Sequence, residues 1–153
     1  MDMDTQTYVY MEDLAPGQVF EAGPVDVTEA EIIAFAQKFD PQDFHLDAAR
    51  AQQTAFGELV ASGWHTAAMT MSMIVAAMPK MKGGMIGRKV EDMSWLRPVR
   101  PGDRLHYRGE ILEIIPSARD TARAEVRTKN TVFNQHGKPV LEMTCLIVVP
   151  RRP

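Results

Sequence analysis

The stretch GWHTAAMTMSMIVAAM, residues 63–78, decides the fold of this 153-residue chain. Pro79 and the Gly83-Gly84 pair bring the predicted helix to an end. Apolar side chains stand on nearly every side of it, namely Trp64, Ala67, Ala68, Met69, Met71, Met73, Ile74 and Val75. A helix that is apolar all round is buried all round. Because 153 residues suit one domain, the rest of the chain is expected to wrap around this helix.

Strand signals replace helical signals after Gly84. Apolar and polar residues alternate most clearly over 122–128, and the segment 134–137, NQHG, is a turn signal between two strands. We expect strands at 88–96, 104–115, 121–134 and 140–149, with Val19-Phe20 as a further edge strand. Short connections predict that these strands are antiparallel neighbours. One central helix under an antiparallel sheet of about five strands is an α+β arrangement that resembles the hot-dog fold, with residues 1–153 as a single domain.

A first helix is predicted from Thr28 to about Asp40. Thr28 and Glu31 form a capping-box pattern, and an apolar stripe follows at helical spacing. Pro41 ends the helix, because a proline disfavours helical backbone in the residue before it. The next segment, 40–57, is polar and turn-like at its start, with room for a short helix over 46–53.

The composition excludes several classes of protein. An apolar fraction of 45% and a charged fraction of 24% are ordinary for a soluble globular protein. A net charge of −3 argues against nonspecific electrostatic binding to nucleic acid or to an anionic membrane. The stretch 67–78 is too short to span a bilayer, and the acidic start, 1–6, does not resemble a signal peptide. Cys145 is the only cysteine and is expected to be a small buried hydrophobe. We therefore expect a cytoplasmic protein.

Asp40 and His45 are the first candidates for chemistry, because they lie in the irregular segment between the two helices. A carboxylate and an imidazole that meet at one water molecule divide the roles of acid and base, and the pKa of histidine lies near physiological pH. The alternative is structural, with Asp40 as a turn residue beside Pro41 and His45 as a capped loop histidine. Spacing alone leaves both interpretations open.

Three separated segments carry a resemblance to a known family. They are 35–47, FAQKFDPQDFHLD, then 56–63, FGELVASG, which leads into the central helix, and 97–103, RPVRPGD. In order and spacing they resemble the MaoC-like dehydratases, which include the (R)-specific enoyl-CoA hydratases. Asn130 and the turn at 134–137 extend the resemblance over most of the chain.

The resemblance implies a reversible addition of water across the double bond of a 2-enoyl thioester of CoA or acyl carrier protein, as in fatty acid metabolism. It assigns the acid–base pair to Asp40 and His45, without deciding which is the acid. It makes the backbone N–H of Gly63, at a helix N-terminus, the donor to the thioester oxygen. Ser62-Gly63 as a simple helix cap is compatible with that role. The resemblance implies no cofactor. It does imply a homodimer or a higher homo-oligomer.

The loop around the pair departs from the family pattern. Lys38-Phe39 stands where the family has a small residue and a glycine, and Gln42 stands where it has asparagine. Asp43 replaces a proline, and Pro41 has moved next to the aspartate. We expect substrate preference to differ at this loop, especially at Phe39, Pro41 and Gln42.

Five further residues are expected to contact the substrate, namely Ser62, Trp64, Met71, Arg97 and Arg100. Met71 belongs to a methionine cluster that suits an adaptable acyl tunnel, although gap-filling in the core explains the cluster as well. The two arginines, with Arg104, suit the phosphates of CoA, and a solvated strand edge explains them equally well. His65 is expected to be a hydrogen-bonded core histidine or a support for Gly63. No set of histidines and cysteines has metal-ligand spacing, so no metal is predicted.

Two other functions stay open. A hot-dog thioesterase has a similar architecture but commonly places an acidic residue on the central helix, and residues 63–78 contain neither Asp nor Glu. A non-catalytic acyl-CoA-binding module would keep the fold and lose the chemistry. The presence of Asp40 and His45 argues against it.

Overall fold

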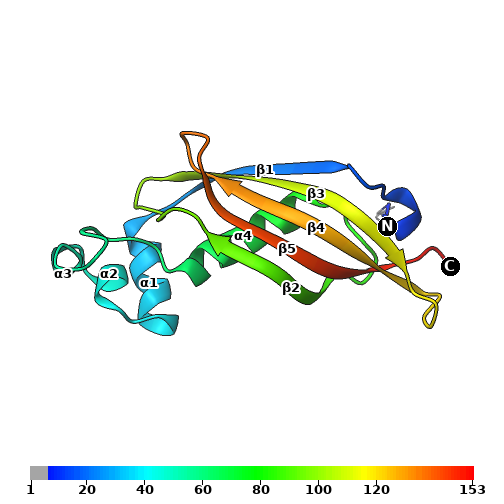
Figure 1. Ribbon diagram of the computed structural model, residues 1–153, viewed down its shortest axis with the longest axis horizontal. Helices are drawn as coiled ribbons and strands as arrows, with labels where there is room; N and C mark the ends of the chain where they lie inside the picture. The colour runs from blue at the N-terminus through cyan, green and yellow to red at the C-terminus, as the bar shows by residue number, and fades with distance from the viewer. Residues whose placement is uncertain (1–6) are drawn as a thin grey trace, which may run out of the picture.

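The computed structural model describes residues 7–153, so the segment 1–6, expected not to be a signal peptide, lies outside the described residues. Among these residues the chain forms five strands and one long helix, whose arrangement can be followed in Figure 1. In chain order the elements are η1 (Met11–Asp13), β1 (Val19–Asp26), α1 (Glu29–Phe39), α2 (Asp43–Leu46), α3 (Ala48–Ala51), α4 (Gly63–Ala77), β2 (Ile86–Trp95), β3 (Arg104–Pro116), β4 (Arg123–Phe133) and β5 (Pro139–Pro150). The α+β hot-dog class is confirmed, and the two predicted long helices and the four predicted long strands are present with ends shifted by a few residues. The edge strand predicted at Val19-Phe20 extends to Asp26, and two four-residue helices, α2 and α3, replace the single short helix predicted over 46–53.

The sheet is antiparallel, in the order β1-β3-β4-β5-β2. The prediction that β2 neighbours β3 was wrong, because β2 pairs with β5 at the opposite edge. The segment between β2 and β3 does not close a hairpin. It bonds elsewhere, with the Val99 carbonyl accepting from Ala61 N–H at 2.8 Å and Gly102 N–H donating to Val27 at 2.8 Å. β1 and β2 are therefore the sheet edges.

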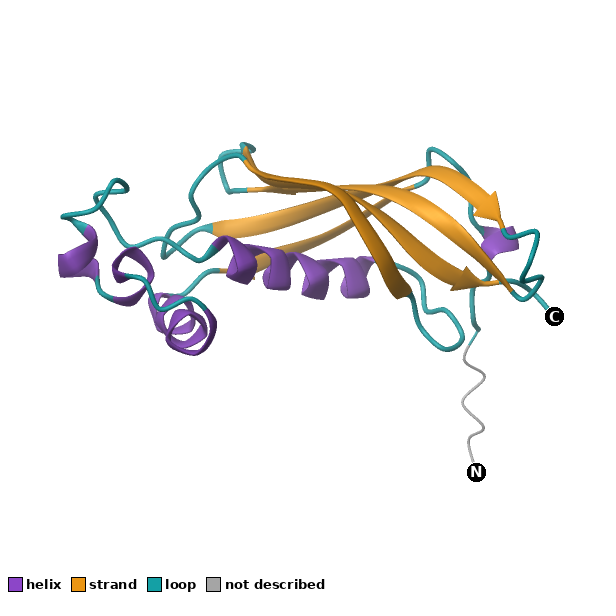
Figure 2. Cartoon of the chain, turned by 60° about the horizontal axis from the view of Figure 1, so that its bottom comes forward, coloured by secondary structure: helices purple, strands orange, loops and turns teal. Residues whose placement is uncertain are grey.

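The prediction that α4 is buried all round was also wrong, because the sheet curves around only one side of it. Figure 2 shows α4 lying along one face of the sheet, and the helix packs mainly against β1 and β3. The part of the helix surface that the sheet leaves uncovered carries an apolar stripe of Trp64, Ala68, Met71 and Val75, with Trp64 59% and Val75 60% exposed. None of the helices within residues 7–153 is long and apolar enough to cross a membrane.

The short helices α1, α2 and α3 gather beyond the N-terminal end of α4 (Figures 1 and 2). The Thr28 side chain caps α1 by accepting from Glu31 N–H at 3.2 Å, which is the Thr28 half of the predicted capping box, and Asp40 follows the last helical residue. Val60 N–H donates to the Phe44 carbonyl at 2.9 Å, which holds the segment before α4 against α2. These contacts bring Asp40 and the start of α4 to the same end of the molecule.

Replacing Met73 with alanine should destabilise the fold. Met73 is 1% exposed on the sheet side of α4, so truncation leaves a cavity and should cost about 2–5 kcal/mol of unfolding free energy. Chemical denaturation measures the loss. Ser72→Ala, at the neighbouring exposed position of the same helix, should change stability by less than about 0.5 kcal/mol. Equal effects of the two substitutions would contradict the orientation of α4.

Candidate functional site

Asp40 stands where α1 ends, and two hydrogen bonds orient its carboxylate. Ser62 Oγ donates to Oδ2 at 2.7 Å, and Gln42 Nε2 donates to Oδ1 at 2.6 Å. Gln42 follows Asp40 by two residues, so the carboxylate is held from its own loop as well as from the start of α4.

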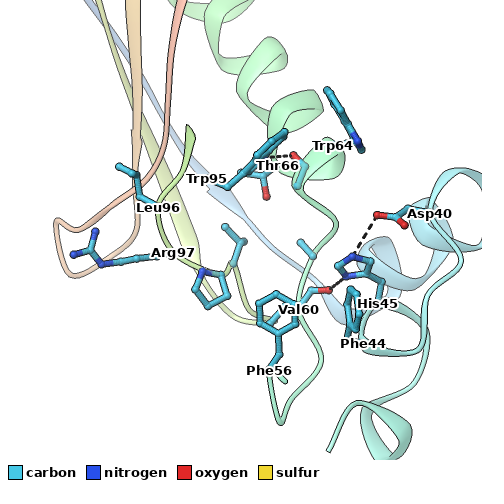
Figure 3. A pocket seen from close by; sticks show the side chains of 14 residues that line it. Asp40, Phe44, His45, Phe56, Val60, Trp64, Thr66, Trp95, Leu96 and Arg97 are labelled. Carbon is cyan, nitrogen blue, oxygen red and sulfur yellow. Dashed lines mark hydrogen bonds and ion pairs between the residues drawn. The ribbon is translucent and has the colours of Figure 1, made fainter. Parts of the chain in front are cut away.

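His45 lies on α2 between Asp40 and Val60, and it is 5% exposed. Figure 3 shows its ring bonded on both sides, with Nδ1 2.6 Å from the Val60 carbonyl oxygen and Nε2 3.3 Å from Asp40 Oδ2. A carbonyl oxygen only accepts hydrogen bonds, so Nδ1 carries a proton. Nε2 is then the nitrogen that exchanges a proton with a neighbour, and it faces the carboxylate.

The pKa of Asp40 is lowered below its ordinary value of 3.8. Burial alone would raise this pKa, but the hydrogen bonds from Ser62 and Gln42 and the charge of His45 together lower it by more. Asp40 is therefore a carboxylate at neutral pH. A hydrogen-bonded carboxylate beside an imidazole is a suitable arrangement for general acid–base chemistry.

Gly63 opens α4, and its backbone N–H has no acceptor among the described residues. The Trp95 indole lies directly against this glycine. Trp95 Nε1 donates to the Gly63 carbonyl at 2.8 Å, and a Cβ added to Gly63 would lie 2.6 Å from the same nitrogen. Only glycine fits here, and a free N–H at a helix N-terminus is a suitable donor to an oxyanion.

A cavity of about 450 Å³ opens beside these groups, and we call it the acid–base cavity. Figure 3 shows Asp40 and His45 on one side of it and Trp95, Leu96 and Arg97 on the other. Gly63 and Trp64 also line it. Sequence reasoning missed Trp95, because the residue ends a strand far from the motif and only the fold brings it to Gly63.

Two of the expected substrate contacts do not line the acid–base cavity. Ser62 is 0% exposed, and its hydroxyl is turned to Asp40. Arg100 lies outside the cavity lining, since its guanidinium pairs with Glu58. Trp64 and Arg97 line the acid–base cavity, and Met71 lines a second cavity.

The second cavity, of about 460 Å³, lies between α4 and the inner face of β4, β5 and β2, and we call it the methionine cavity. It is lined largely by apolar side chains, including Met71, Ile74, Met78, Met85, Met93 and Met143. Trp64 lines both cavities. Cys145 also lines the methionine cavity, and burial raises the pKa of its thiol, which keeps it a neutral, weakly reactive group.

His65 does not have the hydrogen bonds that were expected of a core histidine. Its Nδ1 is buried without a partner in the described part of the chain, and its ring stacks on Phe35 with centroids 4.9 Å apart. Burial lowers the pKa of His65, against an opposing effect of the Glu31 charge. The side chain therefore acts as a neutral ring that packs α4 against α1.

Comparison with known proteins shows which family and fold the chain is similar to. A family model described as a MaoC like domain matches residues 12–134. A MaoC-like dehydratase from Rhodospirillum rubrum is 44% identical, with a TM-score of 0.89 over 95% of this chain and 99% of that one. The unliganded R-hydratase from Pseudomonas aeruginosa is 31% identical, with a TM-score of 0.76 over 95% of this chain and 88% of that one. A 3-hydroxybutyryl-CoA dehydratase from Methylorubrum extorquens is 27% identical over 94% of this chain and 86% of its own length.

Replacing Ser62 with alanine should raise the pKa of Asp40, because one of the two hydrogen bonds to a partly buried carboxylate is lost. Carbon-13 NMR titration of the carboxyl group measures this shift. Ser72→Ala, whose hydroxyl bonds to Met69 instead, should leave the pKa of Asp40 unchanged. An Asp40 pKa that is the same in Ser62→Ala and the wild type would refute the orienting role of Ser62.

The Ser62→Ala substitution should also lower the free energy of unfolding by an amount that depends on pH. The folded pKa of Asp40 lies below 3.8, so the stability that its ionised form contributes is complete above pH 3.8 and is lost as the pH falls through the folded pKa. The difference in unfolding free energy between the wild type and Ser62→Ala should therefore narrow below pH 3.8, leaving only the part due to the lost helix cap.

Proposed function

The chain belongs to the MaoC-like family, and from that premise we propose that it adds water reversibly across the double bond of a 2-enoyl thioester. The observation that carries this proposal is the Asp40–His45 pair, 3.3 Å apart at the edge of the acid–base cavity, next to the free N–H of Gly63. Hydration needs a group that takes a proton from water, a group that gives one, and a donor to the thioester oxygen. These three parts supply them.

The ionised Asp40 and the hydrogen bond to His45 Nδ1 divide the work of the pair. The Asp40 carboxylate takes a proton from the water that attacks the β-carbon. That proton passes from Asp40 to His45 Nε2 across the 3.3 Å contact. Nε2 then gives it to the α-carbon while Nδ1–H stays bonded to the Val60 carbonyl, so both groups return to their starting states. Dehydration follows the same steps in reverse.

Gly63 acts on the thioester oxygen. Negative charge gathers there when water adds to the β-carbon, and the Gly63 N–H at the start of α4 stabilises it. Because Trp95 bonds to the Gly63 carbonyl and leaves no space for a side chain, it holds this peptide in place. Trp95 is a positioning residue in this scheme.

Each of the two cavities holds one part of the substrate. The thioester lies in the acid–base cavity, and the acyl chain extends past Trp64 into the apolar methionine cavity. The carrier, CoA or acyl carrier protein, stays outside. Arg97 is the better of the two predicted phosphate contacts, because the guanidinium of Arg100 is already paired with Glu58.

We also propose a homodimer. The apolar stripe on α4 is exposed in the single chain, and β2 forms a ladder with β5 on one side only. An exposed apolar stripe beside an open strand edge is typical of a surface that a second subunit covers. Pairing of two β2 edges would join the sheets of two copies.

Asp40→Asn and His45→Gln should each lower the rate of crotonyl-CoA hydration by about 10²–10⁴-fold, since each removes one proton-transfer group. Loss of the enoyl absorbance measures the rate. Asp43→Asn is a matched control, because Asp43 is exposed and pairs with Arg50 away from the cavity, and it should keep wild-type activity. Full activity in both Asp40→Asn and His45→Gln would refute the assignment of these two residues as the acid–base pair. Release of free CoA thiol from the substrate would indicate a thioesterase.

Sedimentation should give the wild type a mass of twice 17.1 kDa at micromolar concentration. Val75→Glu puts a charge into the apolar stripe and should shift the protein toward single chains. Lys129→Glu, on the outer face of β4, should leave the mass unchanged. A single-chain mass for the wild type would refute the dimer.

A further inference from the structure

The methionine cavity contains a group of polar side chains that the proposed reaction does not use. Tyr107, Thr128 and Asn130 line it, and they are 3%, 7% and 2% exposed. They stand on β3 and β4, on the inner face of the sheet, among the methionines. Polar side chains are costly to bury and are normally kept in such a place for the hydrogen bonds they make.

The sheet register builds this cluster. Gly109 on β3 lies opposite Asn130 on β4, and Tyr107 precedes Gly109 by two residues on the same face. A Cβ at Gly109 would lie 1.9 Å from the Tyr107 hydroxyl, so the absence of a side chain there lets the tyrosine ring cross to β4. Tyr107 Oη then donates to Asn130 Oδ1 at 2.7 Å, and Asn130 Nδ2 donates to Thr128 Oγ1 at 3.1 Å.

Two hydrogen-bonding positions of the cluster stay open. Within residues 7–153, the Thr128 hydroxyl accepts from Asn130 but has no acceptor for its own proton, and the Tyr107 oxygen donates but accepts no bond. Both oxygens bond to the same amide, so the free donor and the free acceptor lie near each other. A single hydroxyl group is able to fill both, accepting from Thr128 and donating to Tyr107.

The cluster favours a neutral ligand group. Burial raises the pKa of Tyr107 far above neutral pH, so its phenol stays protonated, and neither Thr128 nor Asn130 carries a charge. The cations of the cavity lining, Arg88 and Lys89, lie on the exposed edge strand β2, and Arg88 pairs with Glu125. A carboxylate on the chain would lose its hydration at the cluster without meeting a cation there.

We propose that Tyr107, Thr128 and Asn130 bind a hydroxyl group carried by the acyl chain beyond its double bond, so that the protein prefers hydroxylated 2-enoyl thioesters to plain ones. This inference rests on the proposed function, because it places the acyl chain in the methionine cavity. It adds a second polar contact, separate from the acid–base pair, and it makes the cluster a determinant of specificity.

The test compares 2-enoyl-CoAs of increasing chain length, each prepared with and without a terminal hydroxyl. At the length that reaches the cluster, kcat/KM of the wild type should favour the hydroxylated compound by about tenfold, the value of one well-formed hydrogen bond in an apolar site. Thr128→Val removes the free donor and should bring the ratio of the two substrates toward one. Thr128→Ser keeps the hydroxyl and should keep the preference.

Thr131→Val is the matched control, because Thr131 faces the outer side of the same strand, and its ratio should equal that of the wild type. If Thr128→Val does not fold, Tyr107→Phe, which removes the free acceptor, is expected to reduce the ratio as well. Hydration of crotonyl-CoA with no preference at any chain length would overturn this inference alone. No hydration of any enoyl thioester would overturn the proposed function, and this inference with it.

Discussion

The Ser62 hydroxyl is the contact on which the rest of the site depends. It accepts from Trp64 N–H at the start of α4 and donates to the Asp40 carboxylate beyond the end of α1. The Ser62 hydroxyl oxygen thus connects the N-terminus of α4 to the side chain of Asp40, the residue that follows α1. The free N–H of Gly63 and the carboxylate of Asp40 are close for this reason, and the low pKa of Asp40 has part of its cause here.

The rest of the site is held by backbone groups and one aromatic ring. The Val60 carbonyl sets which nitrogen of His45 carries the proton, and the Trp95 indole leaves room only for glycine at position 63. Each of these contacts joins segments that are well separated along the chain. A site made in this way is fixed by the fold and owes little to local sequence preference.

The position of α4 under the sheet has two consequences. The helix packs mainly against β1 and β3, so the inner face of β4, β5 and β2 is left to the methionine cavity. The part of the helix that the sheet does not cover is left with an exposed apolar stripe that extends from Trp64 to Val75. The space for an acyl chain and the surface for a second subunit therefore have the same origin, which is a sheet that covers the helix on one side only.

Local patterns in the sequence determined much of this protein. The capping residue Thr28, the apolar run after Gly63 and the alternation in 122–128 determined the elements, since hydrophobic period and capping act over a few residues. The spacing of Asp40, His45 and Gly63 pointed to segments that line one cavity, although spacing alone left a structural interpretation open. Tertiary structure decided which strands are neighbours, that α4 is exposed on one side, that Ser62 orients Asp40, and that Trp95 meets Gly63. Those facts depend on contacts between residues far apart in the chain. A local pattern does not specify which distant residues come into contact.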